Sequence, residues 1–289
     1  MIVSHVAIVG LGLIGGSLAR ALRACGAVAH ISGYDPDSSQ RETAQRLGII
    51  DQVCTTPADA VRGADVVVLA VPVLRTAEAL AGCLPARRAD AVVTDVGSTK
   101  QSVLDDVARI CGSVPAWFVA AHPIAGTEKS GIAHAQAELF HRRRVILTPH
   151  EGQDPAARSL VMRLWQAAGA RVVEMDARRH DAIFAATSHL PHVLAYGFVD
   201  MLAGLDRDHD IFPNAGGGFR DFTRIASSSP QMWHDIIRAN ADAVGDLLDR
   251  QIDALLQIRA MMREGRWDAL KALFQRARDA RERYLAQIE

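Results

Sequence analysis

Three glycines at a fixed spacing constrain the fold of this chain more than any other feature. Gly10, Gly12 and Gly15 follow an apolar run that predicts a strand, and they precede a helical pattern. In such a unit the first glycine permits a tight turn, the second lets a pyrophosphate approach the backbone, and the third lets the helix pack on the strand. The pattern predicts a dinucleotide-binding βαβ unit, with Leu13 and Ile14 beside the phosphates at the start of the helix.

An acidic residue ends the next predicted strand. Asp35 lies 20 residues beyond Gly15, where an acid accepts hydrogen bonds from a ribose 2′-OH and repels a 2′-phosphate. This favours NAD over NADP as the cofactor, and Arg41 lies too far along the following helix to be assigned to a 2′-phosphate. Val71 and Pro72 end another predicted strand and are expected under the dinucleotide, although an ordinary strand-to-loop proline explains them equally well.

Short apolar runs alternate with amphipathic segments over the first half of the chain. This alternation is typical of βαβ units and a parallel sheet. We therefore predict an α/β fold whose N-terminal domain, residues 1–176, is a Rossmann-like, mostly parallel sheet that binds the dinucleotide. Its strands are expected at residues 5–9, 31–35, 65–71, 91–95, 117–121, 144–147 and 171–175.

The remainder, residues 177–289, is expected to be an all-α domain. Apolar residues at helical spacing predict one helix over residues 231–264 and, after a break at Gly265, another over residues 267–288. One small domain rarely covers helices of this length, so this domain is predicted to form a homodimer. No Pro-, Gly- or Ser-rich stretch lies near residue 176, which predicts that a helix joins the two domains.

Composition argues against several classes of partner. Lys and Arg number 32 against 33 for Asp and Glu, so no overall basic field attracts nucleic acid or anionic lipid. The four cysteines form no Cys-x-x-Cys pair, which argues against a metal site and a disulfide framework. The first residues show no basic segment of a signal peptide, and the longest apolar stretch, residues 66–74, is too short for a bilayer. We expect a cytoplasmic protein with no metal, nucleic-acid or membrane partner.

The most informative polar segment is His-Pro-Ile-Ala-Gly-Thr-Glu-Lys-Ser-Gly at residues 122–131. It directly follows an apolar run that predicts a buried strand, so His122 is expected at the carboxyl edge of the sheet, where open α/β folds bind ligands. A neutral imidazole with a pKa near the operating pH is well suited to accept a proton. A histidine that only packs or caps is the alternative, but this sequence is poor chemistry for a core strand.

The order of the motifs carries a family resemblance. Together they are similar, over essentially the whole chain, to the prephenate and arogenate dehydrogenases of tyrosine biosynthesis. The resemblance implies an NAD-dependent oxidative decarboxylation in which a hydride leaves C4 of a cyclohexadienol, carbon dioxide leaves C1 and the ring becomes aromatic. His122 matches the family histidine that accepts the C4 hydroxyl proton. The motifs are Gly-Leu-Gly-Leu-Ile-Gly-Gly-Ser at 10–17, Asp-Val-Gly-Ser-Thr-Lys at 95–100, the segment at 122–131, Ser-His-Leu-Pro-His at 188–192 and the glycine-led segment at 216–226.

The resemblance also assigns roles to other residues. Ser98 matches the family serine that hydrogen-bonds the catalytic histidine beside the nicotinamide, with a helix cap as the alternative. His192 and Arg224 match substrate-binding residues, and a guanidinium suits one of the substrate's two carboxylates. Thr127 and Glu128 complete the substrate-binding set, with a solvated loop carboxylate as the alternative for Glu128.

The matched residues are distributed over both predicted domains. Ser98 and His122 fall in the N-terminal domain, whereas His192 and Arg224 fall in the helical one. This predicts an active site at the cleft between the domains. Arg220 is a second candidate cation, and a surface arginine explains it equally well.

Three other functions remain open. The first is the same chemistry on arogenate, or on both substrates. The second is a β-hydroxyacid dehydrogenase or imine reductase, which is disfavoured because the predicted helix at residues 231–264 has no lysine to act as the catalytic group. The third is a non-catalytic NAD-binding module.

Overall fold

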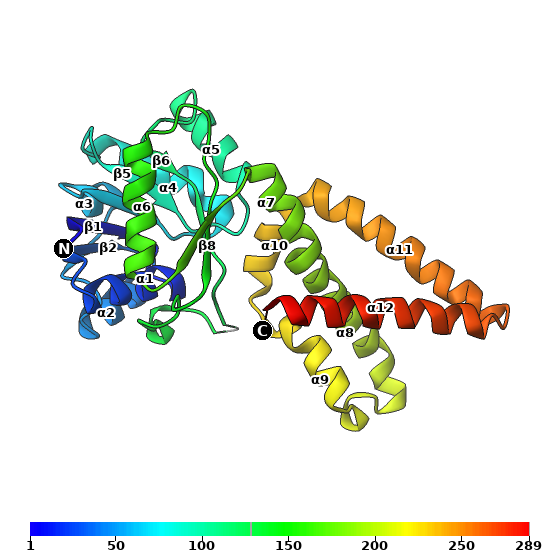
Figure 1. The fold of residues 1–289 in the computed structure, drawn as a ribbon. Helices are drawn as coiled ribbons and strands as arrows, with labels where there is room; N and C mark the ends of the chain where they lie inside the picture. The colour runs from blue at the N-terminus through cyan, green and yellow to red at the C-terminus, as the bar shows by residue number, and fades with distance from the viewer. Residues whose placement is uncertain (128, 289) are drawn as a thin grey trace. The chain divides into compact units, whose positions relative to one another are not determined.

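The computed structural model describes residues 1–127 and 129–288 (Figure 1). Within these residues the main sheet has six parallel strands in the order β3-β2-β1-β4-β5-β6. The chain starts in the middle, fills one side and then crosses to the other, which is the doubly wound arrangement. The predicted α/β class with a Rossmann-like sheet is thereby confirmed. The strands are β1 (Val3–Val9), β2 (Val28–Tyr34), β3 (Gln52–Cys54), β4 (Val66–Leu69), β5 (Val92–Asp95) and β6 (Phe118–Val119).

Successive residues of the strands pack into two hydrophobic cores, one on each face of the sheet. On β1, Val6 and Ile8 belong to one core, whereas Ala7 and Val9 belong to the other. Because side chains alternate across a strand, a sheet covered on both faces needs continuous apolar runs. Helices α1, α2 and α6 cover the first face, and α3, α4 and α5 cover the second. The helices are α1 (Leu13–Ala24), α2 (Ser38–Arg46), α3 (Pro57–Val61), α4 (Thr76–Cys83), α5 (Gln101–Cys111) and α6 (Pro155–Ala167), with 3₁₀ turns η1 (Val73–Arg75), η2 (Leu84–Ala86) and η3 (Ile132–His134).

The strand predicted over residues 117–121 is divided between two sheets. The carbonyl oxygen of Ala120 accepts a hydrogen bond from the Thr148 amide (3.0 Å), and the chain there leaves the main sheet for a separate sheet in the order β7-β8-β9. His122 lies within β7, opposite Ile146, and not directly after a strand of the main sheet as predicted. The pairing of β7 with β8 is antiparallel and that of β8 with β9 is parallel. These strands are β7 (Ala121–Pro123), β8 (Arg144–Leu147) and β9 (Arg171–Glu174).

The chain beyond β9 is helical, as predicted, but the single helix expected over residues 231–264 is wrong. It breaks at Asn240, whose φ of −130° and ψ of 33° are not helical. The side-chain amide of Asn240 donates to the carbonyl oxygen of Asp181 (2.9 Å) and lies 3.1 Å from Nδ1 of His189, so tertiary hydrogen bonds hold the break. The elements are α7 (Ala177–Phe184), the π-helical turn η4 (Ala185–His189), α8 (Leu190–His209), η5 (Phe212–Asn214), α9 (Gly217–Thr223), η6 (Arg224–Ser227), α10 (Pro230–Ala239), α11 (Ala241–Arg263) and α12 (Trp267–Ile288).

Packing divides the chain into two compact units, residues 1–241 and 242–289. The first four helices after the sheets therefore belong to the same unit as the sheets. Near residue 176, where the sequence predicted a domain boundary, the Asp176 carboxylate accepts a hydrogen bond from the Arg179 amide and caps α7. The boundary between residues 1–176 and 177–289 stays a prediction.

Among the described residues, one helical run, Ala177–Asp206, is long and apolar enough to cross a membrane. Length and composition are weak evidence by themselves, because a helix inside a folded domain meets the same criterion. Asp181 in this run accepts hydrogen bonds from the backbone amides of Lys100 and Gln101, which attaches the run to the end of the main sheet. The run was not predicted from the sequence, because polar and charged residues interrupt its apolar side chains and the longest uninterrupted apolar stretch is residues 66–74.

Candidate active site

The glycine loop has the backbone geometry that the sequence predicted. Gly10 has a φ of +105°, and a Cβ there would lie 2.3 Å from the carbonyl oxygen of Ala70. A Cβ at Gly15 would lie 2.2 Å from the carbonyl oxygen of Gly10, so only glycine lets α1 approach the loop this closely. Gly12 caps the N-terminus of α1, and a Cβ there would meet no atom within 4 Å. Gly12 therefore faces open space at a helix N-terminus, where a pyrophosphate fits.

Asp35, at the end of β2, is oriented by the glycine loop. Its Oδ2 accepts a hydrogen bond from the Leu11 amide (2.8 Å) and its Oδ1 accepts one from the Asp37 amide (2.9 Å). Each carboxylate oxygen has a second lone pair, so the acid can still accept a ribose hydroxyl. Arg41 lies closer than predicted, because α2 folds back over the strand end and Nη1 donates to the carbonyl oxygens of Asp35 and Pro36.

The other predicted cofactor residues lie at the same edge of the sheet. Leu13 and Ile14 form the start of α1 and are half-buried. Val71, also half-buried, and Pro72, which is exposed, follow β4. The Val71 amide nitrogen lies next to Gly10, 3.0 Å from where a Cβ of Gly10 would stand. These residues gather around the carboxyl ends of β1, β2 and β4, where open α/β sheets bind ligands.

His122 is a buried imidazole, with 9% of its surface exposed. Its Nδ1 lies 2.8 Å from Nε2 of His180, and its ring packs edge-on against Phe184. Burial lowers the pKa of His122 well below its ordinary value, and the neighbouring basic groups His180, Lys100 and His189 further disfavour its protonation. The imidazole is therefore neutral at pH 7 and able to accept a proton, although its pKa lies lower than the sequence analysis expected.

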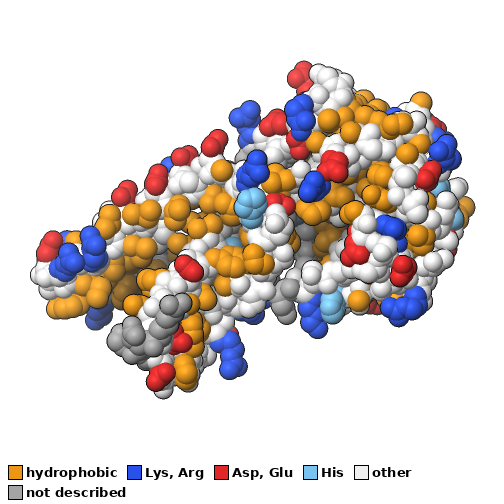
Figure 2. Space-filling model, turned by 180° about the vertical axis from the view of Figure 1, so that it is seen from behind, with side chains coloured by type: hydrophobic (Ala, Val, Ile, Leu, Met, Phe, Trp, Pro, Cys, Tyr) orange, Lys and Arg blue, Asp and Glu red, His pale blue; other side chains and the backbone are white. Residues whose placement is uncertain are grey.

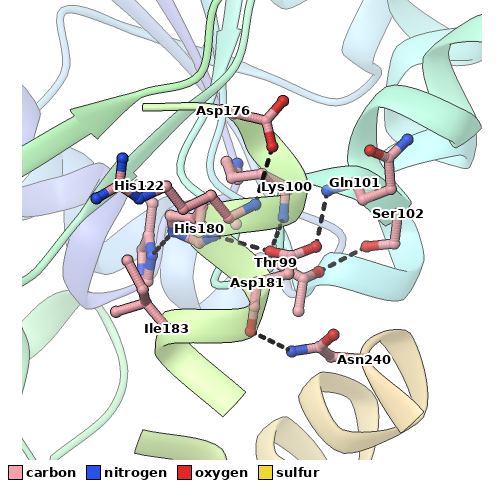
Figure 3. Close-up of polar contacts among 12 residues, drawn as sticks. Thr99, Lys100, Gln101, Ser102, His122, Asp176, His180, Asp181, Ile183 and Asn240 are labelled. Carbon is pink, nitrogen blue, oxygen red and sulfur yellow. Dashed lines mark hydrogen bonds and ion pairs between the residues drawn. The ribbon is translucent and has the colours of Figure 1, made fainter. Parts of the chain in front are cut away.

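A chain of hydrogen bonds continues behind His122, as Figure 3 shows. Nδ1 of His180 lies 2.8 Å from Oδ1 of Asp181. The Asp181 carboxylate also accepts the backbone amides of Lys100 (2.7 Å) and Gln101 (2.9 Å) at the N-terminus of α5. Burial alone would raise the pKa of Asp181, but the hydrogen bonds from His180 and the two amides lower it below its ordinary value. This chain of hydrogen bonds therefore ends in the ionised carboxylate of Asp181.

A buried ion pair supports the backbone next to His122. The Lys100 ammonium is fully buried and donates to Oδ2 of Asp95 (2.5 Å) and to the carbonyl oxygen of Ala121 (2.7 Å). Oδ1 of Asp95 accepts the Ala121 amide (3.0 Å). Burial lowers the pKa of Lys100, and the charge of Asp95 opposes this shift. Lys100 and Asp95 together fix the peptide groups that precede the imidazole.

The sequence analysis missed Lys100, His180 and Asp181 as site residues. Lys100 ends the Asp-Val-Gly-Ser-Thr-Lys motif, but nothing in the motif indicates that its ammonium is buried. His180 and Asp181 follow the capping residue of α7 by one helical turn, a spacing that any helix start shows. Among the described residues, no group of three or more His, Cys, Asp or Glu side chains could hold a metal ion.

Ser98 lies half-buried in the loop between β5 and α5. Within the part of the chain that the structure describes, its hydroxyl makes no hydrogen bond to His122, whose Nδ1 is bonded to His180. Nor is Ser98 the cap of α5, because Lys100 occupies that position. The predicted role of Ser98 beside His122 stays a prediction.

His192 lies on α8 shortly after the π-helical turn. Its Nδ1 donates to the carbonyl oxygen of Ser188 (2.8 Å), which leaves Nε2 as an acceptor. Its ring stacks on Trp233 with the ring centres 3.4 Å apart, and both line a pocket of about 520 Å³. Burial lowers the pKa of His192, and the charge of Arg224 lowers it further, so two predicted substrate-binding residues lie near each other.

The remaining predicted substrate-binding residues are exposed or lie outside the described residues. Arg220 and Arg224 are exposed and line one pocket of about 400 Å³ beside α9. Thr127 is exposed, and its hydroxyl accepts a hydrogen bond from the Lys129 amide (3.2 Å). Glu128 lies outside the described residues. The structure thus brings Arg220 and Arg224 to one pocket, while Thr127 belongs to a separate loop.

The sheet, its glycine loop and the helical region together define a class of protein. The class is that of Rossmann-fold proteins in which a doubly wound sheet with a dinucleotide-type glycine loop is followed by a helical region. Residues 18–174 match the family model described as the prephenate dehydrogenase nucleotide-binding domain, and residues 176–276 match the prephenate dehydrogenase dimerization domain. The chain belongs to the prephenate dehydrogenase family, whose members are oxidoreductases.

Known relatives agree with this assignment over nearly the whole chain. The cyclohexadienyl dehydrogenase of Zymomonas mobilis is 38% identical and covers 96% of this chain and 94% of its own length. The prephenate dehydrogenase of Bacillus subtilis is 36% identical and covers 96% of this chain and 75% of its own length. The solved structure of Aquifex aeolicus prephenate dehydrogenase in complex with hydroxyphenyl propionate and NAD+ has a TM-score of 0.89 at 36% identity, covering 96% of this chain and 97% of its own. Synechocystis arogenate dehydrogenase has a TM-score of 0.80 at 27% identity, covering 97% of this chain and 99% of its own.

Proposed function

We propose that this protein is an NAD-dependent prephenate dehydrogenase of tyrosine biosynthesis, acting in the cytoplasm. It would convert prephenate to 4-hydroxyphenylpyruvate by oxidative decarboxylation. The observation that carries the proposal is the buried, neutral His122 in a chain of this family, close to the carboxyl edge of a sheet that bears a dinucleotide-type glycine loop. A neutral imidazole is the group that such a reaction needs, because the C4 hydroxyl must lose a proton as hydride departs.

The loop fits NAD by its own geometry. Gly10 and Gly15 have no room for a side chain, whereas the space around Gly12 is open. Asp35 presents a carboxylate to the position of the ribose hydroxyls, and Arg41 is engaged by the carbonyl oxygens of Asp35 and Pro36. Bound in this cradle, the oxidised nicotinamide would supply the hydride acceptor.

His122 acts as the general base. As hydride leaves C4, positive charge develops at that carbon and the attached hydroxyl becomes strongly acidic. An imidazole of lowered pKa is then still basic enough to take the proton. Loss of carbon dioxide from C1 supplies the electron pair that makes the ring aromatic, and the imidazolium returns the proton to the phenolate oxygen. Such a base contributes about 10²- to 10⁴-fold to the rate.

The helical residues bind the two carboxylates of the substrate. Arg224 supplies a guanidinium able to hold a carboxylate by two hydrogen bonds, and Arg220 lines the same pocket. The neutral ring of His192 offers Nε2 only as an acceptor, because its Nδ1 donates to Ser188, so His192 donates no hydrogen bond to a carboxylate and contacts the substrate through its ring. Ser98, Thr127 and Glu128 complete the proposed site.

A second copy of the chain would cover the apolar side chains that the helical region leaves exposed. Figure 2 shows hydrophobic side chains gathered over the surface of this region. A homodimer explains these exposed groups, since monomers rarely leave large apolar patches uncovered. The match of residues 176–276 to a dimerization domain supports the same proposal. The large exposed residues of α11 and α12 are Ile252, Leu255, Leu256, Met262, Trp267, Phe274 and Tyr284.

The test is the formation of NADH, followed by its absorbance, with prephenate and with arogenate, and with NADP in place of NAD. We expect turnover with NAD and a higher kcat/KM for prephenate. A higher kcat/KM for arogenate would favour the second candidate, a cyclohexadienyl or arogenate dehydrogenase, which the 38% identity to the Zymomonas mobilis enzyme supports. Binding of NAD without turnover of either substrate would contradict the proposal and favour another substrate or a non-catalytic NAD-binding module.

A further inference from the structure

We propose that His180 and Asp181 are positioning residues that fix the tautomer of His122, with its proton on Nδ1 and a free lone pair on Nε2. This inference rests on the proposed function, in which His122 is the base. His180 and Asp181 thereby join the proposed site as positioning residues. Neither residue lies in a motif that the sequence analysis identified.

The direction of the hydrogen-bond chain is set at Asp181. An ionised carboxylate only accepts hydrogen bonds. Its Oδ2 accepts the Gln101 amide, and its Oδ1 accepts the Lys100 amide and lies 2.8 Å from Nδ1 of His180. Nδ1 of His180 must therefore carry a proton and donate it to Asp181. The two amides at the start of α5 hold the carboxylate in place for this contact.

The proton on Nδ1 of His180 then determines which ring donates in the hydrogen bond between His180 and His122. His180 is fully buried, and burial lowers its pKa, so it is neutral and has one ring proton. With that proton on Nδ1, Nε2 of His180 is an acceptor. Nδ1 of His122, at 2.8 Å from this nitrogen, must be the donor. Because His122 is also neutral, its Nε2 has no proton.

The opposite direction is unfavourable at Asp181, and it would also remove the base at His122. A proton on Nε2 of His180 would place a lone pair of Nδ1 against the Asp181 carboxylate at 2.8 Å. It would also force the His122 proton onto Nε2, where it would prevent that nitrogen from acting as a base. The arrangement of α5, α7 and β7 around these three side chains therefore selects the catalytically competent tautomer (Figure 3).

Two substitutions of His180 separate positioning from packing. In His180→Gln, the carbonyl oxygen of the longer side chain can occupy the place of the imidazole Nε2 and still accept the His122 proton. In His180→Asn, the shorter amide reaches Asp181 but not His122. We therefore expect the glutamine variant to retain the tautomer and the asparagine variant to lose it. His30→Asn, in the amino half of β2, is the control for a partly exposed histidine outside the hydrogen-bond chain.

The direct measurement is the ¹⁵N chemical shift of the His122 ring nitrogens in the full chain with NAD bound. We expect wild type and His180→Gln to show a protonated Nδ1 and an unprotonated Nε2, and His180→Asn to show a mixture of tautomers. With prephenate, kcat should fall about ten- to hundredfold in His180→Asn, with the KM and the NAD affinity changed less than about threefold. His180→Gln and His30→Asn should stay near wild type.

A wild-type His122 with its proton on Nε2 would overturn the proposal, and this result needs no variant. So would an asparagine variant that keeps both the Nδ1-protonated form and full kcat. If the wild type shows the expected tautomer but oxidises neither prephenate nor arogenate, the proposed function fails and the positioning role stands. The two failures are therefore distinguishable.

Discussion

Two regions of this molecule carry the proposed chemistry, and they are built in opposite ways. The glycine loop at residues 10–15 works through backbone atoms and through missing side chains. The imidazole chain works through side chains that come from distant positions: His122, His180, Asp181 and the α5 amides that hold the carboxylate. The first region is local in sequence, and the second exists only in the folded chain.

This difference predicts how each region fails. A side chain added to the loop collides with backbone, which cannot move aside, so the fold or the nucleotide affinity suffers first. A side chain changed in the imidazole chain alters where protons lie, so catalysis suffers first while the fold can persist.

His122→Asn should have the largest effect on activity. It removes the proposed base from the end of the hydrogen-bond chain, so kcat should fall about 10²- to 10⁴-fold. NAD affinity should stay near wild type, because no residue of the glycine loop contacts His122 through a hydrogen bond in the described chain. Steady-state kinetics and NAD titration provide the measurements. An unchanged kcat would remove His122 from the mechanism.

Gly10→Ala and Gly12→Ala form a matched pair in the other region. At Gly10 the φ of +105° and the Ala70 carbonyl oxygen 2.3 Å from the new Cβ should destabilise the fold by about 3 kcal/mol or more. At Gly12 the Cβ meets no protein atom, so stability should stay near wild type while NAD binds more weakly. Urea unfolding and NAD titration separate the two effects. Equal stability of the two variants would contradict the division between the regions.

The same division explains what the sequence could predict. The parallel sheet, the turn at Gly10 and the acid at Asp35 follow from local patterns of apolar residues and spacing, and the structure contains all three. The helix break at Asn240 could not be predicted, because hydrogen bonds to Asp181 and His189, about 50 to 60 residues away in the chain, hold it.

The candidate site was predictable only in part for the same reason. His122 stands in a conspicuous motif, but its position within β7 depends on the hydrogen bond from the amide of Thr148, directly after β8, to the carbonyl oxygen of Ala120. His180 has no such motif around it, and only the packing of α7 against α5 brings it to His122. A helical pattern indicates that a residue is on a helix, not which distant side chain it meets.

The imidazole chain and the neighbouring buried His189 should also make stability depend on pH, which the glycine loop should not. Burial lowers the pKa of His189 to about 4 from 6.5, and it lowers the pKa values of His122 and His180 as well. Between these values the unfolded chain binds more protons than the folded one, so the free energy of unfolding rises with pH from about 4 to about 6.5. His189 alone should contribute about 3 kcal/mol over this range, since one pKa unit is about 1.4 kcal/mol.

Urea unfolding at several pH values, with His189→Gln beside wild type, measures this contribution. The variant should show a shallower rise of stability between pH 4 and pH 6.5, whatever its stability at pH 7. Parallel pH curves for the two proteins would mean that His189 is not held neutral by burial.

Arg224→Ala should give the smallest effect of the series. Arg224 belongs to neither region and is proposed to act only on substrate binding. Arg224 is exposed beside the pocket that it shares with Arg220, and its charge contributes to lowering the pKa of His192. Its removal takes away binding common to the ground state and the transition state, so the KM for prephenate should rise about tenfold while kcat changes less. Arg220→Ala is the matched control in the same pocket and should change the KM less. If Arg220→Ala raises the KM more than Arg224→Ala does, the carboxylate is held by Arg220, and the assignment of these two cations must be reversed.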